Sequence, residues 1–338
     1  MERNEIEDLV QYGTLYNQRF EENYQETHIS WVLFTADFVL KIKKPIKLTF
    51  LDFSTLELRN YFCEQEVKLN SRFSKIYLGV EAICRNGEMW IIGNGGLHVL
   101  DYGVVMCKQE TAFQMDRLLA KNQVSKEAIS QLARQVADFH KKAEVVSTPF
   151  HLNQAKELFR DLRSVLPYFE KLPDSAWADL IADSIRFSDD FLTENQDLFI
   201  ARTKEGNVRD VHGDLHSRNI FLNPEPVIFD CIEFNETFRQ IDVWYEVAFL
   251  CMDMEFFGHS ELSDFFFREY CRQKGESIIK ENMRIFIYFK MLRANVRAKV
   301  LALQASEEDS SKSNIDNLSD PIRYLRLMQS YMEELSPV

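Results

Sequence analysis

The polar residues with the most regular spacing lie between positions 210 and 230. The segment 210–222 reads DVHGDLHSRNIFL, in which Asp214 and Asn219 are five positions apart. The apolar run 227–229 then leads to Asp230, eleven positions beyond Asn219. Kinase-type phosphoryl transfer needs such a set: one aspartate accepts the proton of the attacking hydroxyl, an asparagine on the same loop holds magnesium, and a second aspartate bridges the metal to the phosphates. We therefore expect Asp214 to be the catalytic base and Asn219 and Asp230 to be metal ligands.

Two other interpretations of this segment are open. His212, Asp214 and His216 stand at alternate positions, and such donors could begin a zinc site, but no nearby cysteine or histidine convincingly supplies the further ligands. Aspartate and asparagine in a polar loop also commonly cap turns. Three matched residues at two matched spacings, followed by an apolar strand, favour phosphoryl transfer over both.

The elements that must hold these residues change character near positions 106–110. Before this boundary we expect a β-hairpin at 29–43, a helix at 54–73 that starts with a capping box of Ser54 and Glu57, and strands at 77–85, 89–93 and 99–106. After it, helical periodicity predicts helices at 127–142, 155–168, 175–192, 261–274 and 281–304, with a non-helical island at 198–230. The pattern predicts an α+β fold with two lobes.

The island resembles the aminoglycoside phosphotransferase family, which also contains choline and fructosamine kinases. H-G-D-L-H-x-x-N, followed by the apolar strand ending in Asp230, carries the resemblance. The segment 241–248, IDVWYEVA, is similar to the family's Asp-x-x-x-Asp-Leu-Ala, so that Asp242 is a possible site residue and Glu246 stands where Asp is usual. The resemblance implies that His212 is structural and that His216 flanks the active site.

The resemblance also implies a two-lobed protein-kinase-like fold. The small β-rich N-terminal lobe, 1–107, would bind nucleotide, and the larger helical lobe, 108–338, would carry the catalytic loop and the acceptor site. The segment 29–70 is similar to an uncharacterised bacterial branch of the family, in which I-S-W-V, K-x-K-K-P and F-L-D-F-S-T-L-E recur. Members of this branch sometimes carry an extra C-terminal P-loop kinase domain. This sequence shows no G-x-x-x-x-G-K-[ST] motif, and we expect no such domain in it.

A kinase-like N-terminal lobe needs a lysine that holds the α and β phosphates. Alternation along the strand 38–43 places Val39, Lys41 and Lys43 on one face, so both lysines are eligible. We favour Lys41, because Val39 two residues earlier would cover the adenine ring. Lys43 remains the alternative.

The lysine needs a glutamate partner on the following helix. Glu64 and Glu66 differ by two positions and cannot share a helix face, and we choose Glu66. Ser30, in the polar hairpin that stands where protein kinases have a glycine-rich loop, and Met106, near the lobe boundary, complete the expected nucleotide site. Arg218 stands where the family often has glycine, and it would either touch a substrate phosphate or block the usual acceptor.

The acceptor site of this fold lies on the helical lobe. Acidic and aromatic residues there would suit a cationic or amphipathic acceptor or would form a solvated acidic face: Asp253, Glu255, Glu261, Phe256 and Phe257. Three basic residues on the last long predicted helix would either support the lobe or contact phosphate: Arg293, Arg297 and Lys299.

The charge balance limits the partners. With 40 basic and 53 acidic residues the net charge is −13, which repels nucleic acid. The N-terminus lacks the basic start of a secretion signal and no apolar run approaches membrane-spanning length, so we expect a cytoplasmic protein without a membrane partner. The six scattered cysteines are expected to be reduced.

Together these patterns predict an ATP- and Mg²⁺-dependent phosphotransferase that moves the γ-phosphate to a hydroxyl of an unknown small acceptor. A nucleotide-binding regulatory module that has lost turnover is the alternative. A third possibility keeps the site but transfers a nucleotidyl group.

Overall fold

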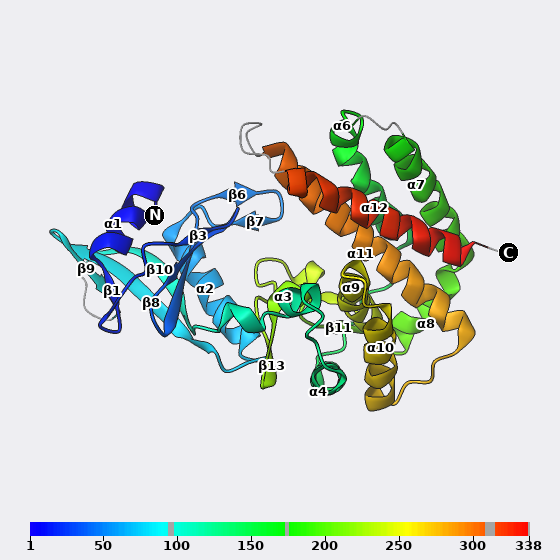
Figure 1. The fold of residues 1–338 in the computed structure, drawn as a ribbon, viewed down its shortest axis with the longest axis horizontal. Coiled ribbons are helices and arrows are strands. Elements are labelled where there is room, and N and C mark those ends of the chain that lie inside the picture. The colour runs from blue at the N-terminus through cyan, green and yellow to red at the C-terminus, as the bar shows by residue number, and fades with distance from the viewer. Residues whose placement is uncertain (94–97, 173–175, 308–314, 337–338) are drawn as a thin grey trace. The chain divides into compact units, whose positions relative to one another are not determined.

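The computed structural model describes residues 1–93, 98–172, 176–307 and 315–336 (Figure 1). The chain forms two compact units. The N-terminal unit comprises Met1–Met115 and Arg218–Arg239, and the helical unit comprises Asp116–Ser217 and Gln240–Val338. The segment with Asn219 and Asp230 therefore belongs to the N-terminal unit, whereas Asp214 belongs to the helical unit. This division follows compactness alone, and the functional boundary at 107/108 stays a prediction.

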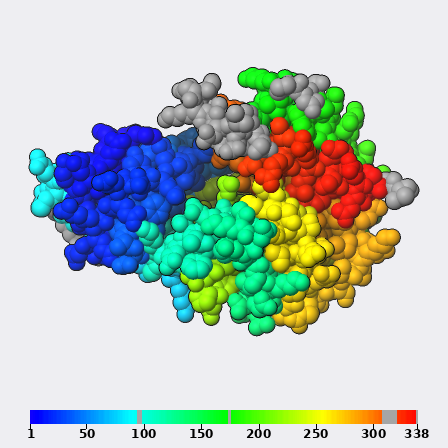
Figure 2. Space-filling model, in the orientation of Figure 1, coloured from blue at the N-terminus to red at the C-terminus, as the bar shows by residue number. Residues whose placement is uncertain are grey.

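A six-stranded antiparallel sheet forms the centre of the N-terminal unit, in the order β3-β4-β5-β10-β8-β9. Its strands are β3 (Gln25–Glu26), β4 (Ser30–Phe34), β5 (Phe38–Lys43), β8 (Tyr77–Asn86), β9 (Met89–Ile92) and β10 (Val99–Cys107). The predicted hairpin at 29–43 is confirmed as β4 and β5, whose register pairs Ser30 with Lys43. The three strands predicted after it are also confirmed. On the face shown in Figure 2, the N-terminal segment, in blue, makes up much of the surface of this unit.

The alternation predicted along β5 is confirmed by the two faces of the sheet. Leu40 and Ile42 pack in a cluster that includes residues of helix α1 (Arg3–Tyr12). Val39 packs on the other face with Met106 and with Cys63 of helix α2 (Leu56–Asn70). The lysines of β5 therefore share the face that α2 covers.

Helix α2 begins one residue later than the predicted capping box requires. Its N-cap is Thr55, whose hydroxyl accepts the Leu58 N–H, whereas the Ser54 hydroxyl donates to Asp52 at 2.5 Å. The predicted capping box of Ser54 and Glu57 is therefore wrong, because Thr55 occupies the capping position. The remaining strands form two-stranded pairs: β1 (Thr14–Leu15) with β2 (Gln18–Arg19), β6 (Lys47–Leu48) with β7 (Leu51–Asp52), and β12 (Ile220–Asn223) with β13 (Glu225–Ile228).

The helical unit is built from α-helices with one small strand pair, β11 (Val208–Asp210) and β14 (Gln240–Asp242). Four predicted helices are confirmed as α4 (Lys126–Lys142), α7 (Ala176–Glu194), α10 (Ser260–Lys274) and α11 (Lys280–Glu307). The single helix predicted at 155–168 is wrong. The chain forms α5 (Leu152–Arg160), a 3₁₀ turn, and α6 (Leu166–Phe169), which carries Pro167 in its first turn. Proline has no N–H to continue a helix, so it starts a new one.

Other helices escaped prediction. α9 (Val243–Phe256) is buried on nearly all sides, and a helix without a polar face has no hydrophobic period to detect. α8 (Gln196–Lys204) shortens the predicted island at 198–230, and α3 (Met115–Ala120) and α12 (Ile315–Leu335) complete the set. None of the six cysteines, all of which lie in the described ranges, forms a disulfide bond. In the part of the chain that the structure describes, no helix is both long and apolar enough to cross a membrane.

Candidate active site

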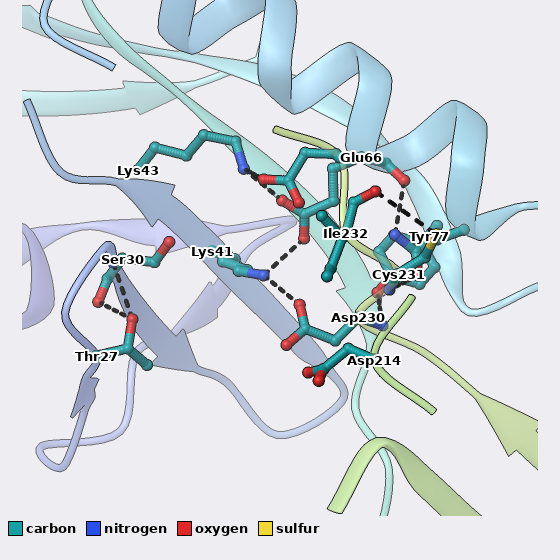
Figure 3. Close-up of polar contacts among 12 residues, drawn as sticks. Thr27, Ser30, Lys41, Lys43, Glu66, Tyr77, Asp214, Asp230, Cys231 and Ile232 are labelled. Carbon is teal, nitrogen blue, oxygen red and sulfur yellow. Dashed lines mark hydrogen bonds and ion pairs between the residues drawn. The ribbon is translucent and has the colours of Figure 1, made fainter. Parts of the chain in front are cut away.

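One carboxylate of helix α2 binds both lysines of strand β5 (Figure 3). The Lys41 Nζ atom lies 2.9 Å from Glu66 Oε1, and the Lys43 Nζ atom lies 2.7 Å from Glu66 Oε2. Lys41 is also 2.6 Å from Asp230 Oδ1, and Lys43 forms an ion pair with Glu233. The structure thus brings together the predicted residues Lys41, Glu66 and Asp230 and the alternative lysine Lys43, and it adds Glu233.

Exposure separates the two lysines. The side chain of Lys43 is fully buried and lies over the Phe53 ring, whereas the side chain of Lys41 is 13% exposed. The Asp230 side chain that Lys41 contacts is 44% exposed. Lys41 therefore has the open position that a phosphate ligand requires. Glu64 is exposed, so the choice of Glu66 over Glu64 agrees with the geometry.

Burial and the lysine charges act in opposite directions on Glu66. Burial alone would raise the pKa of this carboxyl, but Lys41 and Lys43 outweigh it and lower the pKa to about 2. Burial would likewise lower the pKa of Lys41, yet Asp230 and Glu66 raise it well above its ordinary value. Burial raises the pKa of Glu233; Lys43 counteracts this, and the charge of Glu66 adds to it. The cluster therefore holds two cations and three acidic groups, and within it Glu233 is more easily protonated than Glu66.

Backbone contacts hold the carboxylate of Asp230 in place. Asp230 has a φ of 63°, in the left-handed region that costs a non-glycine residue about 1 kcal/mol. Its N–H donates to the Tyr77 hydroxyl at 2.9 Å, and the next N–H, of Cys231, donates to Asn70 Oδ1 at 2.9 Å (Figure 3). The Phe229 N–H donates to the carbonyl of Asn219 at 3.1 Å, so at the open end of the β12–β13 hairpin Asn219 lies opposite Phe229, the residue that precedes Asp230.

The expected adenine and phosphate contacts lie in the same unit. Val39 and Met106 belong to one apolar cluster on the α2 side of the sheet. Ser30 is buried at the start of β4, and its N–H donates to the Thr27 hydroxyl at 2.9 Å. The Ser30 hydroxyl has no hydrogen-bond partner among the described residues. This unsatisfied hydroxyl lies in the hairpin that the sequence predicts to cover the phosphates.

In the helical unit, Glu246 of α9 fixes the catalytic loop. Its Oε1 accepts the His212 N–H at 3.1 Å and its Oε2 accepts the Gly213 N–H at 2.7 Å. His140 Nε2 lies 3.0 Å from the same carboxylate. Burial opposes ionisation of Glu246, but the hydrogen bond and charge of His140 prevail and lower its pKa. A glutamate in place of the family's aspartate therefore clamps the loop directly.

Asp214 follows this clamp. Its N–H donates to His212 Nδ1 at 3.3 Å, and its carboxylate lies 3.3 Å from His216 Nε2. Burial would raise the pKa of Asp214, yet His216 foremost, and His212 and Arg297 after it, hold it well below its ordinary range. His212 is buried beneath the loop, as expected. The two histidines contact Asp214 itself, and no cluster of three or more metal-binding side chains occurs within the described ranges, which leaves the zinc interpretation without support.

Asp242 and Arg218, which were also predicted as possible site residues, do not belong to the lysine cluster or to the contacts of Asp214 described above. Asp242 caps helix α9 through the Trp244 N–H and binds Arg202 with both oxygens, at 2.6 and 2.7 Å, which is a structural arrangement. The Arg218 side chain is exposed, and its carbonyl accepts a hydrogen bond from the Gln114 side chain at 2.7 Å. Both expected roles of Arg218 stay open.

The acidic surface predicted on the helical lobe is wrong for two of its three carboxylates, both of which belong to α9. Asp253 is buried and accepts the Ser217 N–H at 2.9 Å and the Tyr324 hydroxyl at 3.2 Å. Glu255 is likewise enclosed, bound to Lys290 at 2.9 Å and to the Ser263 hydroxyl at 2.6 Å. Their positions on an all-round buried helix explain the error, since an isolated acidic residue in sequence reads as exposed. Glu261 is exposed, and Phe256 and Phe257 are half-buried.

Sequence reasoning missed Tyr77, Asn70 and Glu233. Tyr77 and Asn70 stand at the ends of a strand and a helix, where nothing in the local pattern marks a partner for a distant backbone. Glu233 had a signal: two lysines on one strand face need more than one acidic partner if both are to be buried.

The chain matches known proteins over both units. A model of the phosphotransferase enzyme family matches residues 111–285. Uncharacterized proteins of Mycobacterium tuberculosis and Mycobacterium bovis are each 28% identical over 315 residues, which cover 91% of this chain and 59% of the relative. The chain thus spans about three fifths of the length of these curated relatives.

Solved structures with similar folds include three kinases. A choline/ethanolamine kinase family protein from Mesorhizobium loti has a TM-score of 0.57 at 12% identity, covering 99% of this chain and 97% of that chain. Amicoumacin kinase in complex with AMP-PNP, Ca²⁺ and Ami gives 0.56 at 13%, covering 99% and 98%. The GDP complex of aminoglycoside 2′-phosphotransferase-IIIa gives 0.53 at 14%, covering 98% of each chain. These similarities confirm the predicted α+β, two-lobed, protein-kinase-like fold.

Proposed function

Because the chain belongs to the phosphotransferase enzyme family, we propose that it moves the γ-phosphoryl group of ATP to a hydroxyl group of a small molecule. The family resemblance predicted from the 212–230 island is thereby confirmed. The observation that carries the proposal is the position of Lys41, whose Nζ atom lies 2.9 Å from Glu66 and 2.6 Å from Asp230. A strand lysine held by a helix glutamate beside a metal-binding aspartate is the arrangement that kinase-type phosphoryl transfer requires.

The residues of the N-terminal unit fit a nucleotide with its magnesium ion. Asn219 and the half-exposed Asp230 offer adjacent oxygen ligands, which magnesium prefers, and two protein ligands suffice where phosphates and water supply the rest. The ion would neutralise charge on the phosphates. Lys41 would bind the α and β phosphates, the free Ser30 hydroxyl would reach a phosphate oxygen, and Val39 and Met106 would enclose the adenine ring.

In the helical unit, Asp214 would receive the acceptor hydroxyl. Its lowered pKa makes it a weak base, so we expect it mainly to orient the hydroxyl and to accept the proton late, as a loose transition state allows. Glu246 would keep Asp214 in position by holding the two preceding N–H groups. Most of the rate would come from positioning and from charge neutralisation.

The regulatory alternative is less well supported. A module without turnover would not need Asp214, Asn219 and Asp230 together, and this chain carries all three. The solved relatives named above include one in complex with AMP-PNP and one with GDP, which supports nucleotide binding for either alternative.

Isotope transfer tests the proposal. The purified protein would be incubated with magnesium, a small-metabolite extract and ATP labelled at either the γ or the α phosphate. We expect the γ label to enter a small product with the wild-type protein and not with Asp214→Asn. Incorporation of the α label would instead indicate nucleotidyl transfer, and equal γ transfer by the variant would refute the role of Asp214.

A further inference from the structure

Helix α11 brings an arginine directly to the catalytic loop. An Nη atom of Arg293 donates to the carbonyl of Gly213 at 3.3 Å, and its Nε donates to the carbonyl of Tyr245 at 3.2 Å. Its guanidinium carbon lies 3.7 Å from the centre of the Tyr245 ring. Gly213 immediately precedes Asp214. Since residues four apart share a helix face, Arg297 extends from the same side of α11, one turn further along.

Burial would lower the pKa of Arg297, but Tyr324, Asp253 and Asp214 outweigh it and raise the pKa, so the cation has acidic neighbours, yet one of its donors is left over. Its Nε atom is buried and has no hydrogen-bond partner in the described part of the chain. Tyr324 lies alongside, with its ring centre 5.6 Å from the guanidinium carbon. The nearby Asp253 is already engaged, since one oxygen accepts the Ser217 N–H and the other accepts the Tyr324 hydroxyl. A half-buried cation with an unsatisfied donor costs free energy unless a ligand uses it.

The charge of Arg297 acts where the acceptor must lie. Arg297 stands one helical turn from Arg293, which contacts the carbonyl of the residue before Asp214. Burial would raise the pKa of Asp214, but His216 chiefly lowers it, and the charge of Arg297 adds to the lowering. An acceptor hydroxyl that reaches Asp214 therefore comes near Arg297 as well. The acidic residues expected to attract a cationic acceptor, Asp253 and Glu255, are enclosed by their own partners.

We propose that the acceptor carries an anionic group, a carboxylate or a phosphate ester, beside its reactive hydroxyl, and that Arg297 binds this group. The inference rests on the proposed function, because it takes Asp214 as the residue that faces the acceptor. A guanidinium presents planar, paired donors that match both oxyanions, and its charge discriminates against ammonium groups. Arg297 is thus assigned as a specificity-determining residue.

A set of probes that differ in one terminal group tests this assignment. Galactonate, galactitol, aminodeoxygalactitol and galactitol monophosphate share one polyol chain and end in a carboxylate, an alcohol, an ammonium group and a phosphate ester. Binding would be measured by titration calorimetry with the nucleotide site saturated by magnesium and AMP-PNP. We expect an anionic probe to bind at least about tenfold more tightly than the neutral or cationic one. The affinities for galactonate and for galactitol monophosphate then show whether the site prefers a carboxylate or a phosphate ester.

Variants of one helix separate recognition from folding. Arg297→Gln should abolish the preference for the anionic probe, and Arg297→Lys, which keeps the charge, should retain much of it. The matched control is Lys299→Gln. Lys299 stands on the same helix as Arg297 but forms an ion pair with Asp161 of the 3₁₀ turn after α5, so its loss should leave the preference unchanged. If Arg297→Gln fails to fold, the Arg297→Lys variant and the wild-type probe series still decide the question.

The outcomes separate the inference from the proposed function. Failure of AMP-PNP to bind refutes the proposed function, and the probe titrations without nucleotide then show whether Arg297 recognises anions at all. If AMP-PNP binds, three results would overturn the assignment of Arg297. The protein could bind aminodeoxygalactitol more tightly than the anionic probes, or it could show no preference for the anionic probes. The preference could also survive in Arg297→Gln.

Discussion

The buried ion pair of Lys43 and Glu233 should be the most sensitive point of the N-terminal unit. Both side chains are at least 96% buried, since their exposed fractions are 0% and 4%, and Glu66 shares Lys43 with Glu233. Lys43→Met removes the cation and leaves two carboxylates facing each other. Breaking a buried pair by removing one partner costs about 3–5 kcal/mol, because the remaining charge stays desolvated. We therefore expect Lys43→Met to lose about that much free energy of unfolding at pH 7.

The loss should depend on pH in a defined direction. Without Lys43, burial and Glu66 raise the pKa of Glu233 further above its unfolded value of about 4.3. A group whose pKa is raised on folding stabilises the fold at low pH, and this stability is lost as the pH rises through the folded pKa. The deficit of Lys43→Met relative to the wild type should consequently shrink by up to about 1.4 kcal/mol for each unit that the pH is lowered from 7 towards 5.

Denaturant unfolding of four proteins provides the assay: the wild type, Lys43→Met, Glu233→Gln and the double variant. Glu233→Gln should cost less than Lys43→Met, because Lys43 keeps Glu66 as a partner at 2.7 Å. The double variant buries no unpaired charge at these two positions, so it should recover most of the loss. A Lys43→Met protein within about 1 kcal/mol of the wild type at pH 7, with a difference that does not vary with pH, would refute this reasoning.

Three further predictions concern the remaining parts of the site. Asp214→Asn should abolish phosphoryl transfer while leaving the dissociation constant for magnesium and ATP within about threefold of the wild type, measured by calorimetry. Tyr77→Phe removes the acceptor of the Asp230 N–H, so the KM for ATP should rise about five- to tenfold, as expected for a lost hydrogen bond of about 1 kcal/mol; an unchanged KM would contradict the role of Tyr77. Folding lowers the pKa of Glu246, so this residue stabilises the fold above its unfolded pKa, and the stabilisation is lost as the pH falls through the folded pKa. Thermal unfolding should therefore show a larger loss of stability for Glu246→Gln relative to the wild type at pH 7 than at pH 3.

Local patterns explain why the N-terminal sheet was predictable from the sequence. Successive side chains of strand β5 point to opposite faces of the sheet, so the sequence alone places Leu40 and Ile42 on one face and Val39, Lys41 and Lys43 on the other. The catalytic island was predictable for a different reason. Asp214, Asn219 and Asp230 lie within one short segment, and their spacing along the sequence is enough to recognise them. Neither inference needed contacts between distant parts of the chain.

The missed features depend on such contacts or lack a period. Helix α9 is buried on nearly all sides, and its acidic residues Asp253 and Glu255 gain their partners only in the folded unit. Glu233 meets Lys43 across 190 positions of sequence, and Tyr77 meets Asp230 across 153. No spacing rule reaches that far, so a buried charge network can be read only from the structure.

Binding of magnesium and ATP tests the central claim most directly. Thermal unfolding would be followed with ATP alone, magnesium alone and both together, for the wild type, Lys41→Met, Asp230→Asn and the control Glu64→Gln, which changes an exposed carboxylate on the same helix as Glu66. At about a hundred times the dissociation constant, a ligand adds about 2.7 kcal/mol of stability. The account predicts a shift that needs both magnesium and ATP, persists in Glu64→Gln and disappears in Lys41→Met and Asp230→Asn. No shift in the wild type, or the same shift in Asp230→Asn, would contradict it.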